Sequence, residues 1–223
     1  MDDNKSINKL TLIQENIKKI STNNFTKPEV ICVSKTFSIN VLRPLIDCGH
    51  NHFGENKVQE AEKKWSKIKE ENSALKLHMV GKLQSNKAKK AVELFDFIHS
   101  LDNMKLANVL KKSELQLNKK LSYFIQVNVG DESQKAGITA DSVGDFLKYC
   151  SNEIKLNVIG LMIIPPNDNN TEIYFEKISK LNFDLGLKHL SMGMSSDYKL
   201  AVKFNSTFLR IGSAILGERS FNK

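Results

Sequence analysis

Short β-branched and aromatic runs alternate with helical patterns along this chain, and this alternation constrains its fold more than any other feature. The runs predict eight strands, at residues 30–33, 51–53, 77–80, 97–99, 121–129, 156–164, 188–190 and 207–211. The helical patterns fall at residues 1–20, 38–49, 56–71, 86–94, 103–117, 142–151, 171–183 and 197–203. Strands that alternate with helices favour βαβ units and parallel pairing. Eight such units in 223 residues predict an α/β fold, a small (β/α)8 TIM barrel with an extra N-terminal helix.

A single domain spanning residues 1–223 is expected, because no Gly/Ser linker, charge block or low-complexity segment divides the sequence. A doubly wound open sheet is the alternative fold. Its dinucleotide-binding form needs G-x-G-x-x-G after the first strand, whereas this strand runs into Ser34-Lys35-Thr36. The chain also lacks the G-x-x-x-x-G-K-[ST] motif of a P-loop, so these two nucleotide-binding motifs are excluded.

The basic charge balance does not predict a nucleic-acid partner. The formal net charge is +8, but arginine supplies only Arg43, Arg210 and Arg219 among the 33 basic residues. Nucleic-acid surfaces more often use arginine forks and interleaved aromatic side chains, and aromatic residues make up only 8% of this chain. We therefore expect solvated lysine faces, and we expect any retained arginine to serve where planar geometry is required.

Several further features indicate a cytoplasmic protein that binds no membrane and no metal. No apolar run approaches the roughly 20 residues of a membrane helix, and the chain does not start like a signal peptide. Cys32, Cys48 and Cys150 are widely spaced and odd in number, so we expect reduced thiols. The five histidines form no H-x-x-x-H pair, which favours core or rim histidines over metal ligands.

Polar and small residues gather where the predicted strands end. They are Lys35 after the first strand, residues 54–56 after the second, Gly81 after the third, Asn128 in the fifth, residues 191–195 after the seventh and residues 210–213 after the eighth. In barrels the carboxyl ends of the strands hold the active site, and a phosphate often binds between the loops after strands seven and eight. Small residues with free backbone N–H groups, namely Gly193, Ser195, Gly212 and Ser213, suit that task.

Lys35 is the most specific single candidate for a reactive residue. It follows the apolar run at residues 30–33, and a lysine buried at a barrel mouth becomes more nucleophilic, as a Schiff-base lysine must be. Its position alone also fits a surface lysine, since the chain holds 30 lysines. A lysine that reacts with an aldehyde, on the same face as a phosphate cradle, points to pyridoxal 5′-phosphate.

Six segments of the sequence together resemble a known protein family. They lie at residues 33–36, 53–61, 78–87, 160–162, 190–195 and 210–217, and include Val33-Ser34-Lys35-Thr36 and Phe53-Gly54-Glu55-Asn56. In this order the segments resemble the pyridoxal phosphate homeostasis protein family, which is similar in fold to the N-terminal barrel of alanine racemase. The resemblance covers the chain from about residue 29 to 219.

The resemblance implies a role for each matched residue. It implies that Lys35 forms the Schiff base with pyridoxal phosphate and that Asn56 neighbours the cofactor. It further implies that Ser195, Gly212 and Ser213 hold the phosphate and that Arg210 faces the pyridine nitrogen. Three positions depart from the family pattern: Ser213 replaces a usual Thr, Leu216 a common Phe, and Lys82 a residue that is often His. Lys82, Lys87 and Lys135 receive no role.

We expect a protein that holds pyridoxal phosphate and delivers it to apo-enzymes, without robust turnover and as a monomer. The alternative is a weak amino-acid racemase or lyase with Lys35 as base, and a basic nucleic-acid-binding protein is a more distant one. Racemisation needs an acid on the second face of the substrate carbon, which the resemblance assigns to a tyrosine of an additional domain in alanine racemase. The chain stops at Lys223, directly after the last motif, and Tyr123, Tyr149, Tyr174 and Tyr198 match no such position.

Overall fold

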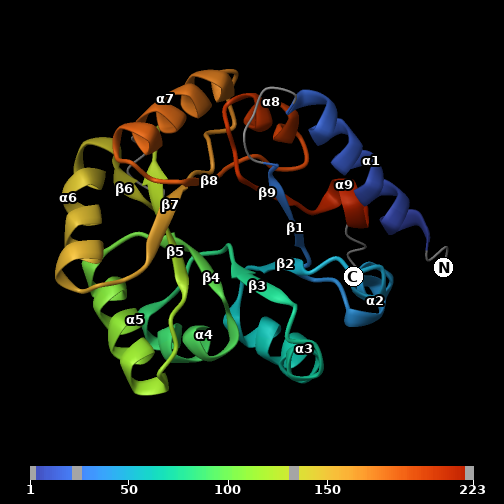
Figure 1. Cartoon of the computed structure of the whole chain (residues 1–223), viewed down its shortest axis with the longest axis horizontal. Coiled ribbons are helices and arrows are strands. Elements are labelled where there is room, and N and C mark those ends of the chain that lie inside the picture. The colour runs from blue at the N-terminus through green and yellow to red at the C-terminus, as the bar shows by residue number, and fades with distance from the viewer. Residues whose placement is uncertain (1–3, 22–26, 131–135, 219–223) are drawn as a thin grey trace.

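Eight parallel strands close into a barrel in the computed structural model, which describes residues 4–21, 27–130 and 136–218 (Figure 1). In order around the ring they are β1 (Glu29–Val33), β2 (His52–Glu55), β3 (Lys76–Met79), β4 (Phe97–Leu101), β5 (Ser122–Asn128), β7 (Val158–Met162), β8 (His189–Ser191) and β9 (Phe208–Ile211). β9 pairs with β1 and closes the ring. The predicted barrel is confirmed, and each predicted strand overlaps one barrel strand.

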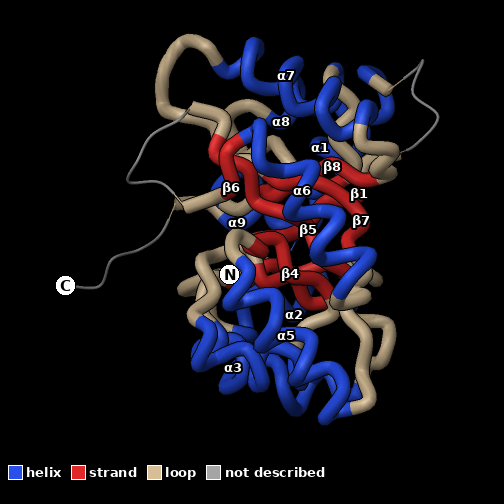
Figure 2. The backbone as a smooth tube through the Cα atoms, turned by 90° about the vertical axis from the view of Figure 1, so that its left-hand side faces the viewer, coloured by secondary structure: helices blue, strands red, loops and turns tan. Residues whose placement is uncertain are grey.

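Helices surround the strands, as Figure 2 shows with helices in blue and strands in red. They are α1 (Asn4–Ile20), α2 (Ile39–Asp47), α3 (Val58–Glu71), α4 (Ala88–Leu94), α5 (Met104–Leu117), α6 (Val143–Lys148), α7 (Thr171–Asp184), α8 (Tyr198–Lys203) and α9 (Ser213–Leu216). The predicted helix at 142–151 is shorter, because α6 passes into a π-helical turn at Tyr149–Glu153. The sequence patterns also missed α9 and the two-residue strand β6 (Ile138–Thr139), which pairs with β5 outside the ring.

The extra N-terminal helix α1 packs against α2, α8 and α9, where the last strands of the barrel meet the first (Figure 1). Its predicted apolar stripe faces inward, since Leu10, Ile13 and Ile17 are buried. This helix therefore covers the seam at which the ends of the chain close the ring.

The strands separate two buried regions. Side chains alternate along each strand, so Leu209 and Ile211 of β9 face the helices and join the main apolar cluster. Phe208 faces the barrel interior, where it clusters with Ile31, Phe124 and Met162. The interior apolar cluster is small, which leaves room for polar side chains inside the barrel.

Two expectations about composition can be compared with the fold. Cys32, Cys48 and Cys150 are all free, in agreement with the prediction of reduced thiols. Within the described ranges, none of the helices has the length and apolarity that crossing a bilayer would require.

Candidate functional site

A cavity of about 550 Å³ opens at the carboxyl ends of the barrel strands. All six residues to which the resemblance assigns a role line it: Lys35, Asn56, Ser195, Arg210, Gly212 and Ser213. Gly193, the other small residue expected to suit a phosphate, is not among the described lining residues. They come from the ends of β1, β2, β8 and β9. β1 and β2 are distant in sequence from β8 and β9, but the four strands are consecutive in the ring, so the pairing of β1 with β9 is what assembles the site.

Lys35 lies in a tight turn directly after β1. The amide of Phe37 donates a hydrogen bond to the carbonyl oxygen of Ser34 at 3.1 Å, which closes the turn around Lys35 and Thr36. Thr36 has a φ of +70°, a left-handed value that favours glycine and strains a β-branched residue. Because this turn is held in one conformation, the half-buried Lys35 enters the cavity wall from a defined point.

A buried carboxylate ties together the segments that carry Lys35 and Asn56. Oε1 of Glu55 accepts hydrogen bonds from Ser34 Oγ at 2.7 Å, from Trp65 Nε1 at 2.9 Å and from Lys64 Nζ at 2.8 Å. The Lys64 ammonium also donates to the carbonyl oxygen of Ser34 at 2.8 Å. Since Ser34 and Glu55 each precede a cavity residue, this cluster positions both residues from behind.

The ends of β2 and β3 approach each other closely beside Asn56. A Cβ atom on Gly81 would lie 2.4 Å from the backbone oxygen of Asn56 and 2.8 Å from its Cα. Only glycine fits at this position without moving the backbone. Gly81 therefore lets the Asn56 segment lie against the end of β3, where both residues line the cavity.

Backbone N–H groups converge at the loops after β8 and β9. The amides of Gly212 and Ala214 donate to Ser195 Oγ, at 3.3 Å and 3.2 Å. A Cβ atom on Gly212 would lie 3.3 Å from the carbonyl oxygen of Val33, so the loop tolerates little bulk there. Two amides and a hydroxyl in one place form a suitable set of donors for a phosphate.

Arg210 is a buried cation between the cavity and the barrel interior. Its guanidinium donates to Ser191 Oγ and to the carbonyl oxygen of Ile163, both at 2.7 Å. Burial lowers the pKa of Arg210 from 12.5 to about 10, and the charge of Asp197 opposes that shift. The guanidinium is therefore still positive at neutral pH, and its planar fork is held on two sides.

The cavity also includes residues that the sequence patterns left without a role. Lys82 lines it, whereas Lys87 lies in the short turn at Ser85–Lys87 and Lys135 falls outside the described residues. Among the described lining residues, β5 contributes Gln126 and not Asn128, whose backbone pairs with Thr139 of the outer strand β6. The signal for Gln126 was present in the sequence as a polar residue at an inward position of an apolar strand.

None of the described lining residues is a tyrosine. Tyr123 donates to Glu114 at 3.0 Å, Tyr149 to Asn108 at 2.8 Å and Tyr174 to Asp168 at 3.0 Å, while Tyr198 accepts from Asn16 at 3.3 Å. These hydroxyl groups are therefore engaged with other partners.

Comparison with known proteins defines the class of this barrel and then the family. The profile of the alanine racemase N-terminal domain matches residues 9–220. Pyridoxal phosphate homeostasis proteins are 35% identical in Pasteurella multocida, over 96% of this chain and 97% of the relative, and 35% identical in Aquifex aeolicus, over 86% and 88%. The chain belongs to the pyridoxal phosphate homeostasis protein family.

Solved structures agree with this assignment. PipY of Synechococcus elongatus, in its form with pyridoxal phosphate bound, is 33% identical and superimposes with a TM-score of 0.80, over 92% of this chain and 100% of PipY. Alanine racemase of Acinetobacter baumannii shares the fold, with a TM-score of 0.74 at 14% identity, over 100% of this chain and 64% of the racemase.

Proposed function

We propose that this chain binds pyridoxal 5′-phosphate in the cavity at the carboxyl end of the barrel, attaches it to Lys35 and acts in its intracellular homeostasis and delivery. The observation that best supports this is the gathering of all six predicted residues around one cavity. The pyridoxal phosphate bound to PipY, a relative with 33% identity, supports the same assignment.

The residues around the cavity fit the chemical groups of this cofactor. Ser195, Gly212 and Ser213 offer hydroxyl and amide donors to a phosphate, and Lys35 offers an amine to an aldehyde. Asn56 lies beside them on the next strand of the ring. When bound, the cofactor supplies an electrophilic aldehyde and an aromatic ring that can accept electrons.

Arg210 favours holding the cofactor over turning substrates over. A guanidinium that stays positive disfavours a second positive charge on a pyridine nitrogen placed against it. An unprotonated pyridine is a weaker electron sink, so carbanion chemistry is less favourable than with a carboxylate partner. The engagement of the tyrosine hydroxyls elsewhere removes the obvious acid for the second face of a substrate carbon.

A weak amino-acid racemase or lyase is the second candidate function. It is favoured by the presence of Lys35 as a possible base in a barrel whose fold alanine racemases share. For the main function we propose apo-enzymes that need pyridoxal phosphate as recipients, a monomeric state in solution and a cytoplasmic location.

A transfer experiment tests the proposed function. The protein is loaded with pyridoxal phosphate, freed of excess cofactor and mixed with the apo-form of an enzyme that needs it. We expect the apo-enzyme to gain activity, because hydrolysis of the bond to Lys35 regenerates the amine and releases the aldehyde. A sample reduced with borohydride should donate nothing, since a reduced C–N bond is not hydrolysed.

The same preparation separates the two candidates. Incubated with L-Ala, L-Ser or L-Lys at saturating cofactor, it should form little or no D-isomer. Multiple turnovers to a D-amino acid, abolished by Lys35→Ala, would contradict the carrier function and establish the racemase.

A further inference from the structure

A line of hydrogen-bonding side chains crosses the interior of the barrel from the cavity to the opposite end. Its members are Arg210, Ser191, His99, His78, His52 and Glu29. Arg210 and Ser191 lie at the carboxyl ends of their strands, whereas Glu29 is the first residue of β1. We call this line the histidine chain.

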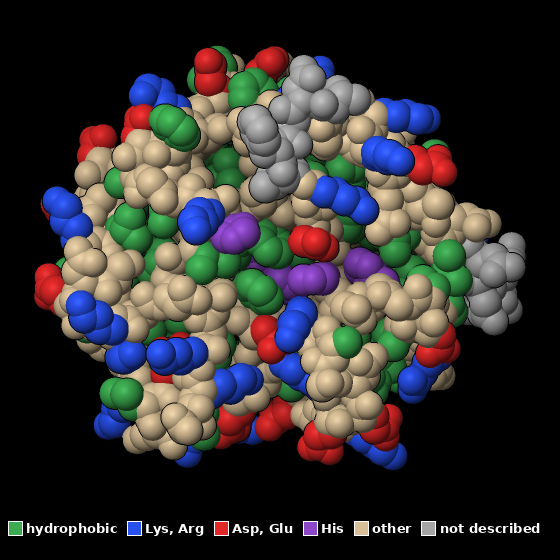
Figure 3. All heavy atoms as spheres, viewed as in Figure 1, with side chains coloured by type: hydrophobic (Ala, Val, Ile, Leu, Met, Phe, Trp, Pro, Cys, Tyr) green, Lys and Arg blue, Asp and Glu red, His purple; other side chains and the backbone are tan. Residues whose placement is uncertain are grey.

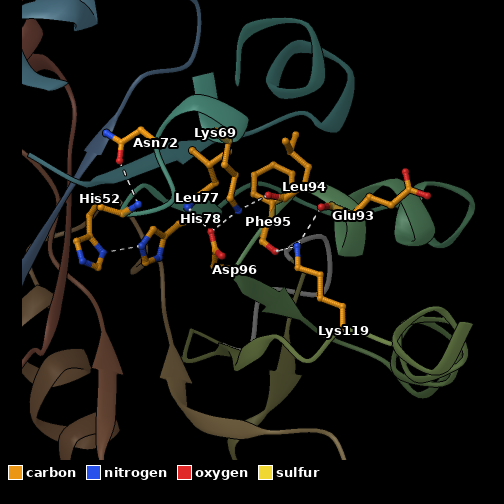
Figure 4. A network of polar contacts seen from close by, with 11 residues as sticks. His52, Lys69, Asn72, Leu77, His78, Glu93, Leu94, Phe95, Asp96 and Lys119 are labelled. Atoms are coloured by element: carbon orange, nitrogen blue, oxygen red, sulfur yellow. Dashed lines mark hydrogen bonds and ion pairs between the residues drawn. The ribbon is translucent and has the colours of Figure 1, made fainter. Parts of the chain in front are cut away.

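The three imidazoles contact one another directly. His99 Nδ1 lies 2.8 Å from Ser191 Oγ, His99 Nε2 lies 3.0 Å from His78 Nδ1, and His78 Nε2 lies 2.9 Å from His52 Nδ1. Figure 4 shows the rings of His52 and His78 turned toward each other. His52 Nε2 is 3.9 Å from a carboxylate oxygen of Glu29, which completes the line.

Strand register explains the alignment. His52 on β2 pairs with Lys76 on β3, two residues before His78, and His78 pairs with Phe97 on β4, two residues before His99. Each histidine therefore stands two residues farther along its strand than its predecessor. Because residues two apart point to the same face of a sheet, all three rings point into the barrel.

The three rings stay neutral inside the barrel. Burial lowers the pKa of His78 and of His99 well below the usual histidine value, and the positive charge of Arg210 adds to the effect at His99. The pKa of the half-buried His52 is lowered by burial and raised by Glu29. A neutral imidazole has one donor nitrogen and one acceptor nitrogen, so each ring can donate in one direction only.

Arg210, the cation at the cavity end of the histidine chain, sets the direction in which the rings donate. Ser191 Oγ accepts from Arg210, and its own hydrogen is satisfied if it donates to His99 Nδ1. His99 then donates from Nε2 to His78, and His78 donates from Nε2 to His52. In the opposite arrangement the contacts of the described residues give the Ser191 hydroxyl hydrogen no acceptor.

We propose that the histidine chain is a single polarised unit, with His52, His78 and His99 all in the Nε2–H tautomer, that positions the Arg210 guanidinium for the cavity. Every acceptor atom in the chain faces Arg210 and every donor hydrogen faces Glu29. This orientation stabilises the buried cation, which forms no ion pair within hydrogen-bond range among the described residues. Ser191 and the three histidines are thus positioning residues.

The Glu29 end of the histidine chain is open to solvent. Glu29 and His52 line a cavity of about 490 Å³ that also includes His50 and Lys76, and histidine side chains gather at the centre of the face in Figure 3. The titratable and charged groups that act on His52 are Glu29, Lys76 and Asp96, together with the neighbouring rings of His50 and His78. A proton bound by His52 from this cavity would make its Nδ1 a donor.

Protonation of His52 would therefore reverse the direction of hydrogen donation along the histidine chain. Its Nδ1–H would face His78 Nε2, so in His78 and then in His99 the hydrogen would move from Nε2 to Nδ1. Ser191 Oγ would then accept from both His99 and Arg210. The reversed dipoles oppose the guanidinium, so we expect the cavity to hold its ligand less firmly at acid pH.

The tautomers are measured directly in the apoprotein, labelled with ¹⁵N-histidine, from long-range ¹H–¹⁵N correlation spectra at neutral pH. His52, His78 and His99 should each show a protonated Nε2 and an unprotonated Nδ1. An Nδ1–H tautomer on His78 or His99 would overturn the proposal. This test needs no cofactor.

Two variants, with one matched control, test whether the members of the histidine chain are connected. His78→Phe keeps a ring against Phe97, whose centroid is 4.3 Å away, but removes both hydrogen bonds, so the nitrogen signals of His52 and His99 should change. His189→Phe is the matched control, because His189 also contacts Phe208 but lies outside the histidine chain. Unchanged His52 and His99 signals in folded His78→Phe would overturn the connected histidine chain.

Glu29→Gln alters the exposed end of the histidine chain, so the variant should fold. It should lower the pH at which His52 titrates, and an unchanged titration would overturn the link to Glu29.

The last arm rests on the proposed function. Kd for pyridoxal phosphate should rise about fivefold in His78→Phe and stay constant in His189→Phe. Equal affinity in the wild-type protein and His78→Phe would overturn the positioning role. If the wild-type protein bound no pyridoxal phosphate, the proposed function would fail. The measured tautomers would still show whether the histidine chain is polarised as proposed.

Discussion

The interior of the barrel and the layer between the barrel and its helices are both buried, yet they contain different side chains. The outer layer is almost wholly apolar and includes fully buried Leu42, Leu45 and Phe175. The interior holds a small apolar cluster around Phe208, with buried His78 and His99 and the guanidinium of Arg210 beside it.

This difference separates stability from binding. Apolar contacts between strands and helices are non-directional and supply most of the free energy of folding. Hydrogen bonds between buried polar groups contribute less net free energy but fix orientation, because each donor must meet its acceptor. The outer layer therefore holds the ring closed, and the interior orients the groups that face the cavity.

Removing a large side chain from the outer layer should have the largest effect on stability. Phe175→Ala leaves a cavity under α7, and we expect the free energy of unfolding to fall by about 3–5 kcal/mol. Denaturant titration measures the loss, and the folded fraction should bind pyridoxal phosphate with unchanged Kd. A variant that kept its stability but lost affinity would break the division between the two regions.

Crowding the loop after β9 at Gly212, where we propose that the phosphate binds, should act on binding instead. Gly212→Val places side-chain atoms against Val33 and displaces the amides that we propose as donors to the phosphate. Loss of one charge-assisted hydrogen bond, worth about 1.5–3 kcal/mol, would raise Kd for pyridoxal phosphate tenfold to a hundredfold. Fluorescence titration tests this, and an unchanged Kd would mean that the phosphate lies elsewhere.

Acid should lower the stability of the protein through its interior histidines. The folded-state pKa of each buried histidine lies below its ordinary value of 6.5, so the unfolded state binds more protons and stability falls as pH drops below about 6.5. Each such histidine contributes a slope of about 1.4 kcal/mol per pH unit. Urea unfolding should show a shallower slope for His78→Phe, whereas a slope equal to that of the wild-type protein would contradict the neutral interior.

Replacing the interior cation by a smaller one should have the smallest effect. Arg210→Lys keeps the charge, but one ammonium cannot reproduce the planar fork that reaches Ser191 and the carbonyl of Ile163. We expect a loss of about 1 kcal/mol in the free energy of unfolding, for one hydrogen bond. Full stability with an unchanged absorbance spectrum of the loaded protein would show that the fork is not required.

The two regions also differ in how far the sequence predicts them. The stripe of Leu10, Ile13 and Ile17 indicated the buried face of α1, because helix periodicity is local. Lys35 and Arg210 could be placed at one end of the ring, because all parallel barrel strands end on the same face. The eight predicted strands were accordingly confirmed.

The interior contacts could not be predicted in the same way. His52, His78 and His99 lie 26 and 21 residues apart along the chain, and they meet only through the register of three neighbouring strands. They look scattered in the sequence for that reason. The support that Glu55 gives to Ser34 also spans two strands, so no local pattern reveals it.

Borohydride reduction followed by peptide mapping tests whether Lys35 is the residue that holds the cofactor. The protein is loaded with pyridoxal phosphate, its visible spectrum is recorded, and reduction fixes the pyridoxyl group on the lysine that holds it. We expect a yellow protein with the label on Lys35, and loss of the visible band in a Lys35→Ala variant that still folds. Label found mainly on Lys82, which lines the same cavity, or on Lys87 or Lys135, would contradict it.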